Sequence, residues 1–252
     1  LTQEDLKSLE ELVADNAGIE DLTGLEAAVN LTRLDLSYNQ IGDISPLASL
    51  TYLTQLDLRS NAISDISPLV SLARLTRLDL WNNQISDLTP IKLRMNLTRL
   101  DLGNNQISDI TPLASLIYLK ELWLGHNQIS DITPLTSRTK LTNLDLGNNQ
   151  IIDASPLASL VKLKELDLGN NQICDVTPLA PLIKLRGLRL VVVSSHRGGQ
   201  EYDTEAAGKA QVELDEVRAE LEGTGVDFEL RQLVRGFEPA EDLIGLASDS
   251  DA

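Results

Sequence analysis

The sequence predicts an α/β solenoid, a stack of short parallel strands joined by turns on the opposite side. Two observations predict it. A 22-residue phrase recurs seven times between residues 31 and 184, and each copy alternates leucine with polar residues where it begins. A strand with this alternation has one apolar side that it cannot bury alone. Stacking the copies buries that side, so the array is built from equal units that contact only their neighbours.

The repeated phrase reads L-x-x-L-x-L-x-x-N-x-I-x-D-x-x-P-[LI], and its 22 positions are called places 1 to 22 below. Its copies begin at Leu31, Leu53, Leu75, Leu97, Leu119, Leu141 and Leu163. This period and this leucine spacing are the signature of a leucine-rich repeat. Proline in every return segment disfavours a long α-helix there. We therefore expect strands on the concave face and turns with 3₁₀ pieces on the convex face.

Leucine and isoleucine in one copy should form one layer of the core: Leu31, Leu34, Leu36, Ile41, Ile44, Leu47 and Leu50. Place 20, the last of these, is arginine in two repeats, Arg94 and Arg138. Because a buried unpaired guanidinium is costly, we expect both arginines to reach solvent, with Leu93 entering the core in place of the first.

Two polar places recur in every copy. Asparagine at place 9 follows the strand, where its amide can satisfy backbone groups of the turn and of the neighbouring repeat. Aspartate at place 13 precedes Ser-Pro or Thr-Pro, and we expect the carboxylate and hydroxyl to accept hydrogen bonds from exposed amides; a metal ladder is the alternative. The residues are Asn39, Asn61, Asn83, Asn105, Asn127, Asn149 and Asn171, and Asp43, Asp65, Asp87, Asp109, Asp131, Asp153 and Asp175.

The two ends depart from the phrase. Residues 1–30 are predicted to form an N-terminal helical cap with a degenerate first repeat, because Leu6, Leu9 and Val13 follow Thr2 at helical spacing. The repeats occupy 31–190, and Val193 stands where asparagine is needed. Residues 191–235 are expected to form a cap with a helix over 204–222 and a strand over 226–234. An acidic tail, predicted to be mobile, occupies 236–252.

The net charge of −17 belongs to the ends, because residues 1–30 carry −7 and residues 191–252 carry −10. The repeats are neutral as a group. This balance favours solubility, and it argues against nucleic acid or an anionic membrane as partner, since both would need a basic stripe. The chain has one cysteine, Cys174, which excludes an intrachain disulfide and is interpreted as an inert small residue.

Solvent-facing side chains of the strands occupy places 3, 5 and 7, with place 8 at the turn. Place 5 is nearly always aspartate, and we expect Arg33, Arg77 and Arg99 at place 3 to pair with this ladder; Ca²⁺ binding is the alternative. Residues that break the face are the candidate partner-binding residues, because tryptophan and arginine are enriched in binding hot spots. With the arginines nearby they are Tyr38, Arg59, Arg77, Trp81, Arg99, Trp123 and His126. Sequence drift is the alternative for the two tryptophans.

The segment NNQISDITPLASL at residues 104–116 closely resembles the 22-residue repeats of the internalins and related bacterial surface leucine-rich proteins. The resemblance extends over roughly residues 9–190. It implies a curved right-handed solenoid with parallel strands on the concave face and a role in protein recognition.

These observations predict a non-enzymatic module that binds a protein on its concave face, without a cofactor or a metal. His126 and His196 lie on different structural units, and no phosphate-binding loop or Cys/His cluster is present. We expect a monomer that does not bind nucleic acid or insert into a membrane, since no apolar run reaches spanning length. The alternatives are an intracellular scaffold similar to the leucine-rich regulatory subunits of phosphatases, or a structural spacer.

The expected localisation is extracytoplasmic or at the cell surface, with the cytoplasm as the alternative. The sequence contains no recognisable signal peptide, and its start at Leu1 suggests a processed or trimmed product.

Overall fold

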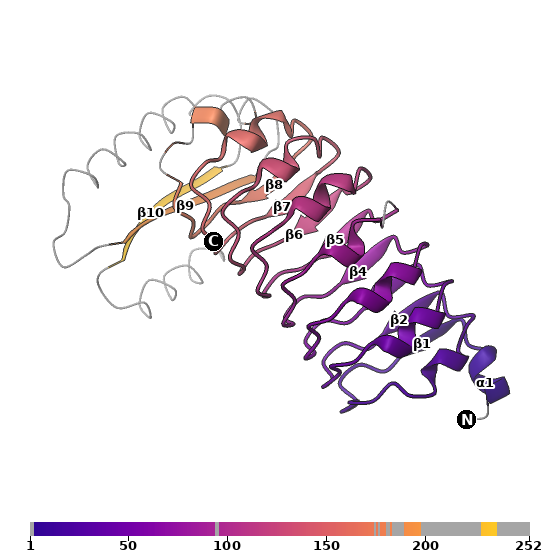
Figure 1. The fold of residues 1–252 in the computed structure, drawn as a ribbon. Coiled ribbons are helices and arrows are strands. Elements are labelled where there is room, and N and C mark those ends of the chain that lie inside the picture. Colours follow the sequence, from indigo (N-terminus) through magenta and orange to yellow (C-terminus); the bar gives the residue numbers. More distant parts are fainter. Residues whose placement is uncertain are drawn as a thin grey trace, which may run out of the picture.

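The computed structural model describes residues 3–93 and 96–173, together with 175, 177–179, 182, 189–197 and 228–235. These residues form one curved ten-stranded sheet in which every neighbouring pair is parallel and the strands follow their order in the sequence (Figure 1). The α/β leucine-rich-repeat solenoid predicted from the sequence is confirmed. Repeats are numbered below from 1 for the degenerate copy at residues 9–30 to 8 for residues 163–184.

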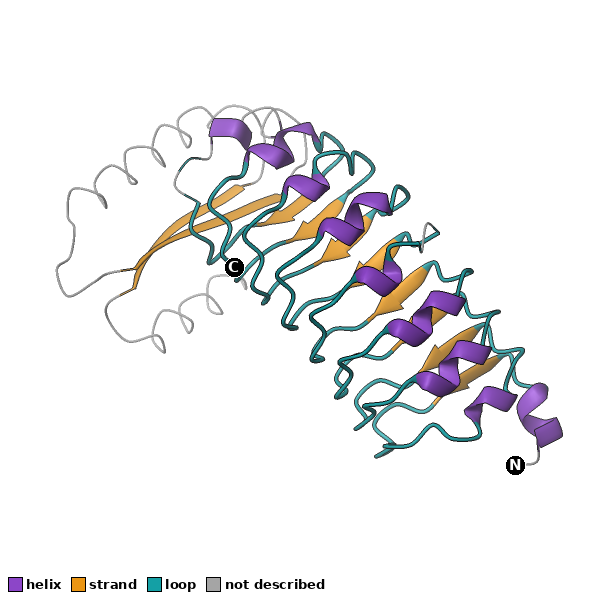
Figure 2. Cartoon of the chain, in the orientation of Figure 1, coloured by secondary structure: helices purple, strands orange, loops and turns teal. Residues whose placement is uncertain are grey.

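Each repeat contributes one short strand and one 3₁₀ helix, and the two kinds of element lie on opposite sides of the molecule (Figure 2). The strands are β1 (Glu11–Val13), β2 (Arg33–Asp35), β3 (Gln55–Asp57), β4 (Arg77–Asp79), β5 (Arg99–Asp101), β6 (Glu121–Trp123), β7 (Asn143–Asp145), β8 (Glu165–Asp167), β9 (Arg189–Arg197) and β10 (Phe228–Arg235). The 3₁₀ helices are η1 (Leu25–Ala27), η2 (Ser45–Ser49), η3 (Ser67–Ser71), η4 (Thr89–Ile91), η5 (Thr111–Ser115), η6 (Thr133–Leu135), η7 (Ser155–Ser159) and η8 (Thr177–Leu179). Proline sits in the first turn of η2 to η7, where its missing N–H costs nothing.

The core is one column of leucine and isoleucine layers. The seven apolar residues of repeat 2 named above are at most 1% exposed, as the periodicity predicts. Strand partners from β1 to β8 are 22 residues apart in sequence, so each leucine lies beside the leucine of the next repeat. Between β8 and β9 the partners are 24 residues apart, as with Leu166 and Leu190.

The place-9 asparagine acts as predicted, joining its own turn to the preceding repeat. In repeat 5, Nδ2 of Asn105 donates to the carbonyls of Leu102 at 3.1 Å and Leu80 at 3.0 Å, and Oδ1 accepts from the Ile85 amide at 2.9 Å. The same set of bonds recurs from Asn39 to Asn171.

The place-13 aspartate caps the 3₁₀ helix of its own repeat. Asp43 Oδ1 accepts from the Ser45 amide at 2.8 Å, and the bond recurs in repeats 3 to 7. The expected role of the hydroxyl is wrong, however, because the Ser45 hydroxyl donates to Asp43 Oδ2 instead of accepting from an amide. Among the described residues no group of three or more His, Cys, Asp or Glu is placed to hold a metal ion.

The ends match the prediction in part. Helix α1 spans Gln3–Lys7, but Val13, expected on the same helix, lies in β1 and is 53% exposed. At the other end β9 spans Arg189–Arg197 without a turn at Val193, and β10 pairs with it as the strand predicted over 226–234. The helix expected over 204–222, the tail from 236, and Thr2, Arg94 and Cys174 lie outside the described residues.

The expectation that Arg138 reaches solvent is wrong. Its side chain is 8% exposed, and Nε and Nη1 are buried without a hydrogen-bond partner. Burial lowers the pKa of the guanidinium below its usual value. The return segment is rearranged there, as expected: η6 is three residues long, whereas η5 and η7 have five. The predicted entry of Leu93 into the core is also wrong, because Leu93 is 68% exposed.

Substituting Arg138→Leu should raise the free energy of unfolding by about 2 kcal/mol, because it removes a guanidinium with two buried nitrogens that lack hydrogen-bond partners and restores the leucine found at place 20 in neighbouring repeats. Urea denaturation measures the change. Lys162→Leu, an exposed substitution with the same loss of charge, is the control and should stay within about 0.5 kcal/mol. A gain no larger than the control's would show that the guanidinium has partners in solution.

Asn105→Ala should lower the free energy of unfolding by about 1 to 3 kcal/mol, because it leaves backbone groups of two repeats without partners. The exposed neighbour Gln106→Ala, which keeps its backbone bond to Ile85, is the matched control. Equal denaturation midpoints for the two variants would contradict the role of the asparagine.

Candidate protein-binding surface

The concave face consists of the side chains that flank the central leucine of each strand. In β5, Leu100 is buried, Arg99 is exposed, and Asp101 is half-buried. This alternation places the residues at places 3 and 5 of every repeat on the solvent side, as the sequence predicts.

The place-5 aspartates are held by the backbone of their own repeat. Asp35 Oδ1 accepts from the Ser37 amide at 3.0 Å, and the same bond recurs at Asp57, Asp79, Asp101, Asp145 and Asp167. The predicted pairing with place-3 arginines is wrong for two of the three, because Arg33 pairs with Glu11 at 3.1 Å and Arg99 with Glu121 at 3.3 Å. Arg77, the third of these arginines, makes no ion pair with another described residue.

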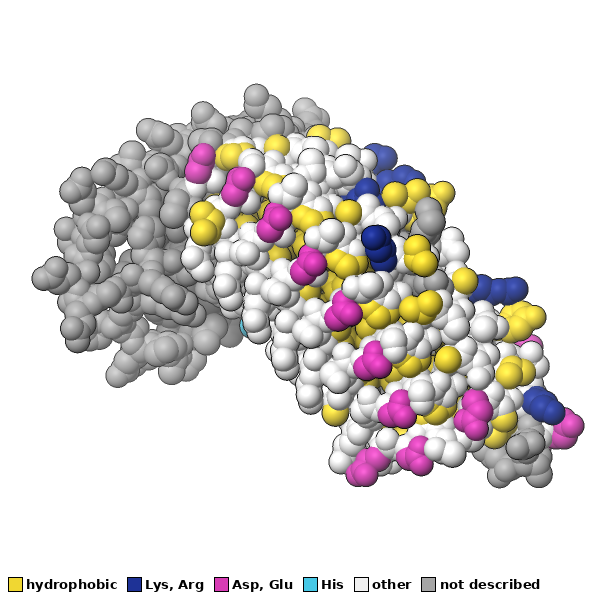
Figure 3. Space-filling model, viewed as in Figure 1, with side chains coloured by type: hydrophobic (Ala, Val, Ile, Leu, Met, Phe, Trp, Pro, Cys, Tyr) yellow, Lys and Arg dark blue, Asp and Glu magenta, His cyan; other side chains and the backbone are white. Residues whose placement is uncertain are grey.

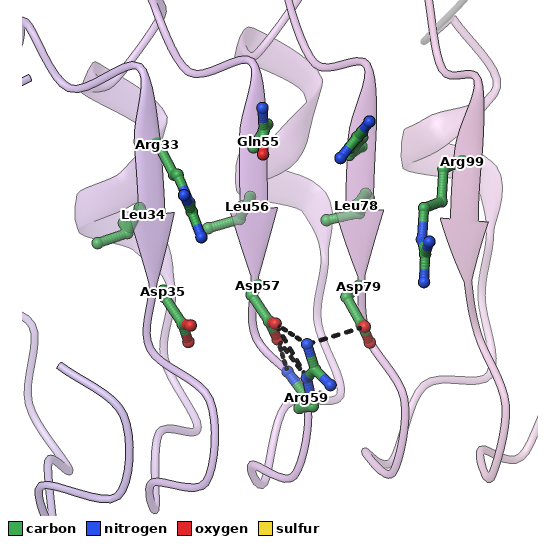
Figure 4. Close-up of a pocket in the computed structure, with 11 residues that line it drawn as sticks. Arg33, Leu34, Asp35, Gln55, Leu56, Asp57, Arg59, Leu78, Asp79 and Arg99 are labelled. Atoms are coloured by element: carbon green, nitrogen blue, oxygen red, sulfur yellow. Dashed lines mark hydrogen bonds and ion pairs between the residues drawn. The ribbon is translucent and has the colours of Figure 1, made fainter. Parts of the chain in front are cut away.

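Arg59 provides the pairing that was expected of the place-3 arginines. Its guanidinium bonds to Asp57 and lies 3.6 Å from Oδ2 of Asp79, so it joins the carboxylates of two neighbouring repeats (Figure 4). The hydrogen bond to Asp57 raises the pKa of Arg59 above its usual value. The guanidinium of Arg59 is therefore already paired with the place-5 aspartates.

The two tryptophans lie on either side of repeat 5. Trp81 lies over Gly103, where an added Cβ would stand 2.8 Å from its Cδ1. Trp123 is in register with Asp101, and the Arg99 guanidinium lies 4.5 Å from the centre of its ring. We call Trp81, Arg99, Asp101 and Trp123 the central cluster. Trp123 removes a ladder carboxylate, so the amide at place 7 of repeat 6 has no place-5 acceptor in its own repeat.

The pKa of Asp101 is raised to about 6, chiefly by burial. The Gly103 amide opposes this rise, the carboxylates of Asp79 and Asp145 add to it, and Arg99 opposes it. The same desolvation raises the pKa values of Asp79 and Asp145 above the usual range. Asp101 was not singled out from the sequence as a site residue. Its register with Trp123 was the available signal.

Two hollows lie on the concave face. One is lined by residues of repeats 2 to 5: Arg33, Leu34, Asp35, Gln55, Leu56, Asp57, Arg59, Arg77, Leu78, Asp79 and Arg99 (Figure 4). The other is lined by residues of repeats 6 to 8: Trp123, Asn143, Leu144, Asp145, Glu165, Leu166 and Asp167. The first hollow contains both signs of charge, whereas the charged residues of the second are all acidic. Trp123 stands at the boundary between them.

Of the seven candidate residues, Arg59, Arg77 and Arg99 line the first hollow and Trp123 lines the second. Trp81, Tyr38 and His126 line neither of these hollows, and Tyr38 and His126 occupy place 8 with φ of 57° and 58°. His126 Nε2 lies 3.1 Å from Nδ2 of Asn148 in the next repeat.

Comparison with known proteins agrees with this architecture. The profile of the family described as Leucine Rich repeats (2 copies) matches residues 29–71, 53–93, 96–137 and 139–181. The chain therefore belongs to the leucine-rich-repeat family. No curated protein matches it, and none of the described helices is long and apolar enough to cross a membrane.

Within that family the chain is internalin-like. It is similar to the crystal structure of internalin C2 from Listeria monocytogenes, with 42% identity over 76% of this chain and 84% of that chain and a TM-score of 0.72. Another internalin of that organism, InlF, is 30% identical over 96% of this chain and 87% of that chain, with a TM-score of 0.46. A leucine-rich-repeat protein of Leptospira interrogans shares the fold, with 20% identity over 94% of this chain and 59% of that chain and a TM-score of 0.72.

Asp101→Asn should stabilise the protein at pH 7.5 by about 1 to 2 kcal/mol and change little at pH 4. The folded pKa of Asp101, about 6, lies above the reference value of 3.8. Folding therefore favours the protonated form, and stability is lost as pH rises from about 4 through 6. Asparagine keeps an acceptor for the Gly103 amide and has no charge to desolvate; one pKa unit corresponds to about 1.4 kcal/mol before solvent screening.

Asp109→Asn is the matched control for this measurement. Hydrogen bonds from Thr111 lower the pKa of Asp109, so its carboxylate is the form that the fold favours, and neutralising it should not stabilise the protein at pH 7.5. Urea denaturation at the two pH values decides. Stabilisation by Asp101→Asn that is equal at both would contradict desolvation of Asp101.

Proposed function

We propose that this chain is a non-enzymatic recognition module that binds a protein partner on its concave face, with the central cluster as the main contact. The observation that carries the proposal is the pair of tryptophans on either side of repeat 5. Tryptophan breaks the repeat pattern there at two different places. Trp123 is in register with Asp101 of repeat 5, and Trp81 lies over Gly103 of the same repeat. A contact surface built from large aromatic side chains and arginine is typical of binding hot spots.

The charges around the cluster favour a partner with its own charge pattern. Arg77 lines the mixed-charge hollow and is exposed. It makes no ion pair with another described residue. On the other side of Trp123 the hollow presents Asp145, Glu165 and Asp167. A partner that places a carboxylate near Arg77 and basic groups over repeats 7 and 8 would complement both sides.

We propose an extracytoplasmic or cell-surface setting, supported by the likeness to internalin C2. The intracellular scaffold remains the alternative within binding proteins, and the spacer is the alternative that needs no partner. Fractionation of cells that express the full gene product separates the two settings. The tryptophan variants below separate both from the spacer.

Trp81→Ala and Trp123→Ala should each weaken partner binding by about 2 kcal/mol or more while leaving folding nearly intact, because both side chains lie on the concave face outside the leucine core. Partners are first captured by the parent protein and identified by mass spectrometry, and their Kd values are then measured with purified components. Ile152→Ala, which removes an exposed apolar side chain at place 12, is the control and should bind like the parent.

Trp123→Asp gives a second readout from the same position. It should abolish binding yet retain the parent's stability or exceed it, because aspartate at place 5 would supply the acceptor that the Gly125 amide lacks. If this variant binds every identified partner with the parent's Kd, the tryptophans carry no function and the spacer is favoured. If Trp123→Ala unfolds the protein, the assignment of place 5 to the solvent side is wrong.

A further inference from the structure

The charges of the repeats are separated onto two opposite edges of the solenoid. The six segments that lead from a 3₁₀ helix to the next strand, residues 48–54, 70–76, 92–98, 114–120, 136–142 and 158–164, contain no aspartate or glutamate. On the opposite edge, places 8 to 15 of repeats 2 to 8 contain no lysine or arginine and carry the capping aspartates. Figure 3 shows a row of carboxylates along the molecule and Lys and Arg gathered along the other edge, with hydrophobic side chains between them.

The repeats are neutral in sum, and their cations are gathered along one edge. We call the exposed cations of these leading segments the basic edge: Arg74, Lys92, Lys120, Lys140, Lys162 and Lys164. The ion pairs that join described residues lie on the concave face, and none of them involves these six. Four of the six belong to repeats 6 to 8, where neighbouring strands are only about 4.8 Å apart.

Exposed apolar side chains alternate with these cations. Ile117 and Tyr118 are 43% and 46% exposed, and Val161 is 51% exposed, so they stand beside the lysines of repeats 6 to 8. A linear polyanion such as nucleic acid would bind the cations and would not require the apolar side chains between them. Lysines interleaved with tyrosine and aliphatic residues instead suit the boundary between lipid headgroups and acyl chains.

The tyrosine rings of this edge are covered by cations. The Arg74 guanidinium lies 4.3 Å from the ring centre of Tyr52, and the Lys140 ammonium lies 4.3 Å from that of Tyr118. Single-stranded nucleic acid binds through bases stacked on free aromatic faces. Because these faces are occupied by the neighbouring repeat, stacking of bases is disfavoured on this edge.

We propose that the basic edge docks the solenoid on a bilayer surface rich in anionic phospholipid. The lysines approach the phosphates, and Ile117, Tyr118 and Val161 enter the headgroup region without spanning the membrane. The net negative charge of the chain belongs to residues 1–30 and 191–252 and not to the repeats. This site is distinct from the concave face, which edge-on docking would leave open to a protein partner.

The test is sedimentation of the full chain with vesicles of equal parts phosphatidylglycerol and phosphatidylcholine, with phosphatidylcholine alone as the neutral surface. We expect binding to the anionic vesicles only, weakening as salt is added. The triple variant Lys140→Gln, Lys162→Gln, Lys164→Gln should lower the partition coefficient about tenfold or more. The matched control is the triple variant Gln106→Glu, Gln128→Glu, Gln150→Glu. It makes the same change in net charge on the opposite edge, which carries the place-13 aspartates, and it should bind like the parent. Circular dichroism confirms that both variants are folded.

Two further arms identify the occupant. The double variant Ile117→Ser, Val161→Ser should lower partition into anionic vesicles while keeping the salt dependence, and an unchanged partition coefficient would overturn the choice of a bilayer. Heparin and duplex DNA are tested by fluorescence anisotropy. Binding to either of them without binding to vesicles would overturn the proposal, as would equal losses in the lysine and glutamine triple variants or no vesicle binding by the parent.

Discussion

The amide of the place-9 asparagine is the interaction on which the rest of the structure depends. One side chain closes the turn of its own repeat and bonds to the repeat before it, so turning and stacking cannot be separated. Place 8 adopts positive φ in every repeat from 2 to 8, and the chain turns inward there. No asparagine stands between Arg189 and Arg197, and there the strand runs on for nine residues without a turn. The leucine layers supply most of the burial, but the asparagine fixes where each layer begins.

The fold could be predicted because period and place determine it. Leucine spacing gave the strands, proline gave the 3₁₀ helices, and each asparagine bonds as its chemistry requires. The wrong predictions concern the contacts of individual side chains, which the place in the repeat does not determine. Arg138 stays in the leucine column although its charge favours water. Arg33 and Arg99 at place 3 pair with glutamates of neighbouring strands instead of with the aspartates. Aspartate at place 5 had already found a backbone partner in its own repeat, which no residue count reveals.

The candidate site could be predicted only as a set of places. Sequence reasoning placed Trp81 and Trp123 on one face, yet it did not predict that Trp81 lies over Gly103 or that Arg99 lies over the Trp123 ring, because these contacts depend on side-chain direction. It also summed the charges of the repeats to zero and missed that opposite signs occupy opposite edges. In a solenoid the residues at one place of successive repeats form a line along the molecule. The charge of a surface is therefore obtained by summing over one place in all repeats, and not over a stretch of sequence. Counted that way, the concave face and the basic edge are independent surfaces on one scaffold.

Glycine at place 7 leaves room for side chains of the neighbouring repeats. A Cβ on Gly103 would stand 2.8 Å from Cδ1 of Trp81, and a Cβ on Gly125 would stand 2.7 Å from Oδ2 of Asp145. A side chain at either position would therefore displace a residue of the concave face. The position of Trp81 thus depends on a neighbour that contributes no side chain of its own, and the concave face can be altered at place 7 without any change in the leucine layers.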